Sequence, residues 1–180
     1  MIIAANKIDI PGAYKNYKKI KENFPDYTIV PCSAECELAL KEASRNGLID
    51  YVPGEDNFKI TEPDKLSPKQ EKALNFIKNK ILKKYGKTGV QEVLNKAVFD
   101  VLNYIAVFPV PNNKLKDNKG HILPDCFLVP KDITALGFAY KVHNTMGENF
   151  IEAKDVKTKR PIKKDQPLKH RQVVEIVFNK

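Results

Sequence analysis

Residues 1–12 read MIIAANKIDIPG, and this stretch decides how the rest of the chain is interpreted. The first five residues are continuously apolar, which predicts a buried β-strand that ends where a polar loop begins at Asn6. In open α/β sheets, ligand-binding loops lie at the carboxyl ends of the strands. The loop that begins at Asn6 therefore stands where a ligand-reading loop is expected.

The residues that follow repeat the order of helix, strand and loop. Residues 14–23 predict a Lys-rich helix, residues 27–31 (YTIVP) a second short strand, and residues 35–46 a second helix. Strands that alternate with helices predict an α/β arrangement with a parallel sheet. Ser33 and Ala34 come directly after the second strand, so we expect both loops at the same edge of the sheet.

The two loops together predict a guanine-reading site. Guanine presents its N1–H and its N2 amine side by side, and the carboxylate of Asp9 can accept both hydrogen bonds. Asn6 can bond the N7/O6 edge and tie the loops together, while the Lys7 stem can lie flat on the base. Ala34 can offer its backbone N–H to guanine O6, and Ser33 can brace the loop.

The same residues also allow simpler interpretations. Asn and Asp suit turn positions in any solvated loop, and Ser33 suits the N-cap of a helix. The stretches Asp9-Ile10-Pro11-Gly12 and Asp117-Asn118-Lys119-Gly120 also match Asp-x-x-Gly, the motif on the magnesium side of GTPases. Ser33-Ala34 further along the chain favours the base-reading role for Asp9.

Residues 51–103 predict a loop followed by two amphipathic helices. Ser67 caps the first helix, which is expected to end at Gly86, and Thr88 can cap the second. Two amphipathic helices joined by a short turn predict a helical hairpin.

Residues 104–180 predict a small α+β domain with one helix packed across a mixed sheet. This part has a net charge of +6 against +3 for residues 1–103, from a total of +9, and a basic surface favours polyanions. Its densest basic cluster, a candidate RNA-binding surface or simply a solvated face, comprises Lys154, Lys157, Lys159, Arg160, Lys163 and Lys164.

Other classes of protein are disfavoured. No apolar run approaches the roughly 18–20 residues that span a bilayer. Three cysteines, an odd number, argue against a disulfide framework and indicate a reducing cytoplasm. Cys32 and Cys36 have no second pair of ligands nearby, so no metal site is predicted. No nucleophile–base pair stands out, so no catalytic residue is predicted.

On these motifs, the sequence resembles the Obg-like translational GTPases whose chains end in a TGS domain. The resemblance covers nearly the whole chain and rests on the following stretches: Asn6-Lys7-Ile8-Asp9, Ser33-Ala34-Glu35, Tyr51-Val52-Pro53-Gly54, Thr88-Gly89-Val90-Gln91, Leu123-Pro124-Asp125, 134–143, Gly147 and 173–177. It implies three parts: residues 1–50 as the last strands and helices of a P-loop GTPase domain, residues 51–103 as a loop and helical hairpin, and residues 104–180 as a β-grasp TGS domain.

The resemblance also implies GTP or GDP binding and an association with the ribosome or RNA. One departure matters: the sequence has no Gly-x-x-x-x-Gly-Lys-Ser/Thr loop to hold the β- and γ-phosphates. Hydrolysis depends on phosphate positioning and Mg²⁺, so we expect no hydrolysis by this chain alone, and Mg²⁺ binding only together with a missing N-terminal part. The alternative is a non-catalytic RNA- or ribosome-binding module that carries a GTPase remnant.

Overall fold

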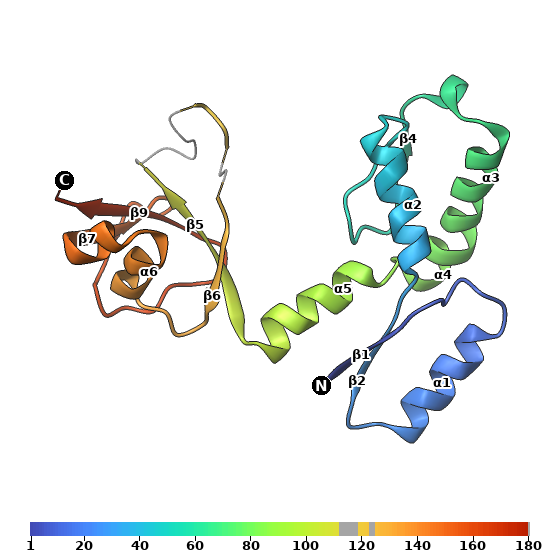
Figure 1. Ribbon diagram of the computed structural model, residues 1–180, viewed down its shortest axis with the longest axis horizontal. Helices are drawn as coiled ribbons and strands as arrows, with labels where there is room; N and C mark the ends of the chain where they lie inside the picture. The colour runs from blue at the N-terminus through green and yellow to red at the C-terminus, as the bar shows by residue number, and fades with distance from the viewer. Residues whose placement is uncertain (112–118, 123–124, 180) are drawn as a thin grey trace. The chain divides into compact units, whose positions relative to one another are not determined.

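A computed structural model of the chain describes residues 1–111, 119–122 and 125–179 (Figure 1). Asp117 and Asn118 of the second Asp-x-x-Gly match, and Leu123-Pro124 of the TGS-like stretch, lie outside these residues. The chain divides into two units, Met1–Ala97 and Val98–Lys180.

The first unit begins with the predicted alternation of strands and helices. β1 and β2 pair in parallel, with Ile2 opposite Thr28, so the loops that follow them leave the same end of the sheet. β1 is only half-buried, contrary to the prediction, because β2 is its single partner strand among the described residues. The elements are β1 (Ile2–Ala5), α1 (Ala13–Asn23), β2 (Thr28–Pro31), α2 (Ala34–Arg45), β3 (Ile49–Asp50), β4 (Lys59–Ile60), η1 (Pro63–Lys65), α3 (Pro68–Phe76), the π-helical η2 (Ile77–Leu82), α4 (Lys83–Tyr85) and α5 (Val90–Asn95).

The core of this unit joins α2 to the long helical segment α3–η2–α4. Leu40 of α2 is fully buried, and it belongs to one cluster with Leu74 and Ile81 from that segment. This packing places the apolar stripe of the first predicted helix against α2. Gly86 ends the first helix in the left-handed region at φ 74°, and the chain then turns so that α5 packs against β1.

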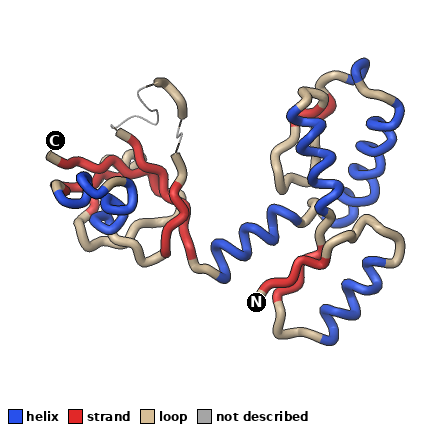
Figure 2. Tube along the Cα trace, in the orientation of Figure 1, coloured by secondary structure: helices blue, strands red, loops and turns tan. Residues whose placement is uncertain are grey.

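The second unit confirms the predicted mixed sheet with one helix across it (Figure 2). The strand order is β6-β5-β9-β7-β8, with β5 and β9 parallel and the other neighbours antiparallel. Phe138 of α6 packs on Val107 and Val174, and all three are fully buried. The remaining elements are η3 (Lys96–Val101), which begins just before the boundary between the units, β5 (Tyr104–Val110), β6 (Phe127–Pro130), α6 (Ala135–Val142), α7 (Asn144–Glu148), β7 (Phe150–Asp155), β8 (Pro161–Ile162) and β9 (Gln172–Phe178).

Side-chain caps fix several helix starts, and the cap at Ser67 confirms the prediction from the sequence. Ser67 accepts a hydrogen bond from the backbone N–H of Gln70 at 3.3 Å, and Thr134 accepts one from Gly137 at 3.1 Å. These bonds satisfy amide groups that have no partner within the first helical turn. Within the described ranges, no helix combines the length and apolarity that crossing a membrane requires.

Candidate functional site

The loops after β1 and β2 are joined where they leave the strands. The Cys32 N–H donates to the carbonyl of Ala5 at 3.0 Å, and the Ile8 N–H donates to the carbonyl of Cys32 at 3.1 Å. Lys7, between these contacts, adopts the left-handed conformation at φ 67°. The first loop therefore turns sharply and stays in register with the second.

Asn6 connects the two loops through its side chain. Its Oδ1 accepts a hydrogen bond from the backbone N–H of Ala34 at 3.0 Å. From the sequence we expected that N–H to contact guanine O6, whereas in the structure it donates to Asn6. The remaining polar group of the Asn6 side chain is its NH₂ group, which can only donate hydrogen bonds.

Asp9 contributes an unsatisfied acceptor to this site. Its Oδ1 is buried and has no hydrogen-bond partner, whereas buried carboxylate oxygens in proteins are normally paired. Asp9 lies close enough to the start of α2 for its charge to act on the Cys36 thiol. Burial raises the pKa of that thiol, and the negative charge of Asp9 raises it further.

Ser33 is fully buried and holds the second loop in place. Its Oγ accepts from the Cys36 N–H at 3.2 Å, which caps α2, and its own N–H donates to the carbonyl of Thr88 at 2.8 Å. The predicted cap by Thr88 is wrong, because Gly89 stands at the N-cap of α5 without a side-chain bond. The Thr88 hydroxyl donates instead to Oε2 of Glu37.

Three buried residues support this site, and the sequence did not reveal their contribution: Glu37, Tyr51 and Thr88. The Tyr51 hydroxyl donates to Oε2 of Glu37 at 2.9 Å, beside the bond from Thr88. One signal in the sequence could have found them: Glu37 follows Cys36 and precedes Leu40 by three residues, which places a charge on the apolar stripe of α2.

The accessible part of the site differs from its support. Asn6, Lys7 and Ala34 are exposed, Asp9 is half-buried, and Ser33 is inaccessible. The structure thus brings all five predicted guanine-site residues into one pair of loops, and four of them are at least partly exposed, although Oδ1 of Asp9 is itself buried.

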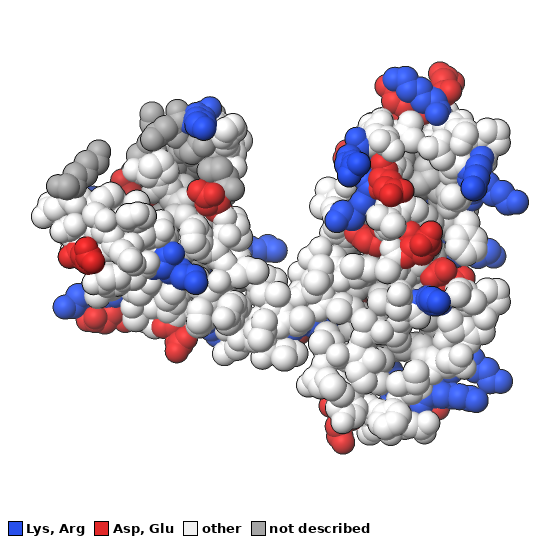
Figure 3. Space-filling model, in the orientation of Figure 1, with Lys and Arg blue, Asp and Glu red and all other residues white. Residues whose placement is uncertain are grey.

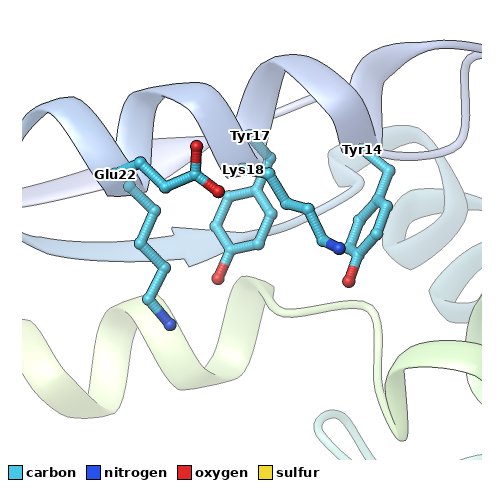
Figure 4. Close-up of a pocket in the computed structure, with 5 residues that line it drawn as sticks. Tyr14, Tyr17, Lys18 and Glu22 are labelled. Atoms are coloured by element: carbon cyan, nitrogen blue, oxygen red, sulfur yellow. The ribbon is translucent and has the colours of Figure 1, made fainter.

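Two hollows lie along α1, close to these loops. One of about 470 Å³ runs beside β1 and is lined by Asn6 and Lys7 at its loop end and by Tyr17 and Ile20 of α1. The other, of about 460 Å³, is lined only by α1 side chains, including Tyr14, which extend to the same side of the helix (Figure 4). Asp9, Ser33 and Ala34 line neither hollow, so only the first hollow reaches the guanine loops, through Asn6 and Lys7.

The basic cluster of the second unit lies around the β7–β8 turn. Lys157, Lys159 and Arg160 are exposed in that turn, and Lys163 and Lys164 are exposed directly after β8. Lys154 differs from these residues.

Lys154 lies on β7 and forms an ion pair with Glu152 at 2.8 Å, and this hydrogen bond raises the pKa of Lys154. On the face shown in Figure 3, acidic and basic side chains are interspersed over both units. The predicted cluster is therefore five exposed cations and one that is paired.

Cysteine and metal chemistry have little support in the described ranges. Cys32 and Cys36 are buried free thiols, and Cys126 is an exposed one. No group of three or more His, Cys, Asp or Glu side chains among the described residues could hold a metal ion.

Comparisons with known proteins agree with this architecture. Residues 4–112 match the family described as "Obg-like GTPase YGR210-like, G4 motif-containing domain", and residues 105–178 match the TGS domain. A protein of Methanocaldococcus jannaschii described as an uncharacterized GTP-binding protein is 49% identical over 98% of this chain and 44% of its own length. A Schizosaccharomyces pombe protein with the same description is 33% identical over 74% of this chain and 34% of its own length.

A solved structure supports the same relationship. The crystal structure of a GTP binding protein from Pyrococcus horikoshii OT3 matches with a TM-score of 0.72 and 36% identity, over 99% of this chain and 46% of that protein. The chain thus spans less than half the length of these relatives. On these matches, it belongs to the YGR210-like group of Obg-like GTPases, with the G4 motif-containing domain followed by a TGS domain.

Proposed function

We propose that this chain carries the base-recognition part of a guanine-nucleotide-binding protein. The observation that carries the proposal is the buried Oδ1 of Asp9, which lacks a donor beside a loop that Asn6 ties to Ala34. The relatives are described as GTP-binding proteins, which agrees with this assignment.

The chemistry of guanine suits the groups that remain available. The N1–H and N2 amine are donors, and they match the carboxylate of Asp9, whose Oδ1 has no hydrogen-bond partner. Guanine N7 and O6 are acceptors, and they match the donating amide of Asn6. The exposed Lys7 stem can cover the apolar face of the base. Adenine carries an acceptor at N1 and no N2 amine, so Asp9 would reject it.

Hydrolysis is a separate matter. The sequence contains no phosphate-binding loop, and phosphoryl transfer depends on holding the phosphates and a metal ion. We therefore propose base recognition for this chain, and GTP hydrolysis only for a longer protein that supplies a phosphate site. The three free thiols favour a reducing compartment, and we propose the cytoplasm.

The exchange of Asp9→Asn tests base recognition. In an NMR titration of the chain with guanosine and xanthosine nucleotides, the wild type should prefer guanosine, because a carboxylate accepts from the N2 amine. The variant should prefer xanthosine by at least about tenfold, because the Asn amide donates to the carbonyl at C2. Asp26→Asn, an exposed exchange in the same unit, is the control and should leave the preference unchanged. An unaltered guanosine preference in Asp9→Asn would reject the assignment.

We also propose that the second unit binds single-stranded RNA or a ribosomal RNA surface through the exposed cations around the β7–β8 turn. Five exposed basic side chains lie within eight residues of one another between Lys157 and Lys164, with Asp155 and Asp165 at either side. Such clusters bind phosphates with release of counterions.

A matched pair of double variants tests RNA binding. Replacing Lys157 and Lys159 by Gln should weaken binding of a short RNA oligonucleotide and reduce the slope of log K against log salt by about 1–2. Replacing the exposed Lys131 and Lys141 by Gln removes the same charge elsewhere in the unit and should leave that slope intact. Equal losses in both double variants would mean that net charge alone acts.

A further inference from the structure

Glu37 is the one charged side chain that is buried among the described residues, with 6% of its surface exposed. It lies in the first turns of α2, four residues after the Ser33 that begins the helix. A buried carboxylate is costly unless hydrogen bonds compensate for its lost hydration, so its partners should reveal its role.

Two hydroxyl groups from distant segments donate to the same oxygen of Glu37. Tyr51 reaches Oε2 from the residues after β3, and Thr88 reaches it from the turn before α5. Tyr51 is held in turn by the Gly54 N–H, which donates to its hydroxyl at 3.3 Å. Glu37 therefore binds two segments of the chain, at Tyr51 and at Thr88, to the start of α2.

Thr88 connects Glu37 to the second guanine loop by two hydrogen bonds. Its backbone carbonyl accepts the Ser33 N–H, while its hydroxyl donates to Glu37. Ser33 and Glu37 are the two ends of the first turn of α2, and the Glu37 N–H donates to the carbonyl of Ser33 at 3.1 Å. Thr88 therefore contacts this turn at both ends, through its backbone at Ser33 and through its hydroxyl at Glu37. Ala34, whose N–H contacts Asn6, lies within that turn.

Gly89 shows how closely the Thr88 segment approaches the loop. It adopts φ 86°, and a Cβ at this position would lie 2.1 Å from the carbonyl oxygen of Pro31 and 2.9 Å from Cα of Cys32. Only glycine allows this backbone contact. The segment before α5 thus packs directly on the backbone that delivers Ser33 and Ala34.

We propose that Glu37 is a positioning residue of the guanine site, acting through Thr88 on the backbone of Ser33 and Ala34. This proposal rests on the guanine-binding function proposed above. Glu37 itself does not touch the base; it holds the Thr88 hydroxyl, and Thr88 fixes the turn in which Ala34 meets Asn6. The Glu37 carboxylate suits this position because one of its oxygens, with two lone pairs, accepts from both hydroxyl groups at once.

The variants Thr88→Val and Thr88→Ser test this role as a matched pair. Val keeps the shape of the side chain and loses the donor, whereas Ser keeps the donor. Thr88→Val should lower the affinity for guanosine nucleotides by about tenfold and reduce the preference over adenosine nucleotides. Thr88→Ser should stay within about threefold of the wild type in both respects. Glu37→Leu should reproduce the Val result, because both donors then lose their acceptor.

Amide hydrogen exchange separates positioning from loss of folding. Protection at Ser33 should fall in Thr88→Val, while protection at Val107 in the other unit serves as the internal reference. If Thr88→Val loses Ser33 protection but keeps wild-type affinity and base preference, the network is merely structural and this proposal is overturned. If the wild type itself does not prefer guanosine, the proposed function fails, and this proposal fails with it.

Discussion

At the scale of the residue, Tyr51 shows what a buried carboxylate does to its neighbour. Tyr51 is 6% exposed, and its pKa is raised to about 12 by burial first and by its hydrogen bond to Glu37 second. Both causes disfavour the phenolate, because its charge would be poorly solvated and would face another anion. The phenol is therefore the form that the folded protein requires.

This shift predicts how stability depends on alkaline pH. Unfolded Tyr ionises near pH 10, whereas folded Tyr51 stays protonated up to about pH 12. Its contribution is fully present below pH 10 and is lost as the pH rises towards 12, by up to roughly 2–3 kcal/mol in the free energy of unfolding. Urea unfolding at a series of pH values should show this loss as the difference between the wild type and Tyr51→Phe. A constant difference across that range would contradict the shift.

At the scale of the element, α1 and β1 contrast with the strands of the second unit. None of the α1 residues is buried, and β1 pairs with β2 alone among the described strands. Contacts at the helix surface hold α1: Tyr14 lies 5.9 Å from the ring of Tyr85, with the Lys84 ammonium 5.0 Å above the Tyr14 ring. Such contacts stabilise less than burial in a core.

Hydrogen exchange should reproduce this contrast. Amides of β1 and α1 should exchange faster than those of β5 and β9, which contribute the fully buried Val107 and Val174. The α2 amides should be protected more than those of α1, because Leu40 belongs to the core of the first unit. Mass spectrometry of exchanged peptides measures this order, and equal protection of α1 and β5 would rule it out.

The elements also show what a sequence can predict. The strand–loop order located Asn6, Asp9 and Ser33 correctly because those loops follow local patterns. Thr88 was misjudged because a threonine just before a helix is a common N-cap, whereas the bond that its hydroxyl makes spans 51 positions to Glu37. Long-range pairings of that kind depend on packing, which no local pattern encodes.

At the scale of the whole chain, each of the two units has its own hydrophobic core. The predicted parts 1–50 and 51–103 are joined in the first unit by one core, in which Leu40 packs with Ile77 and Ile81. The second unit closes its own core around Phe138. The family match to residues 4–112 likewise runs across the predicted boundary at residue 50.

The contact of Gly89 with Pro31 and Cys32 bears on how this protein can be dissected. A fragment cut at residue 50 keeps every side chain assigned to guanine but leaves behind Tyr51, Thr88 and Gly89. Such a fragment would carry the recognition motif on an unsupported turn. The smallest piece that can be transplanted, shortened or recombined with its base-reading loops intact therefore extends past Gly89 to the end of the first unit at Ala97.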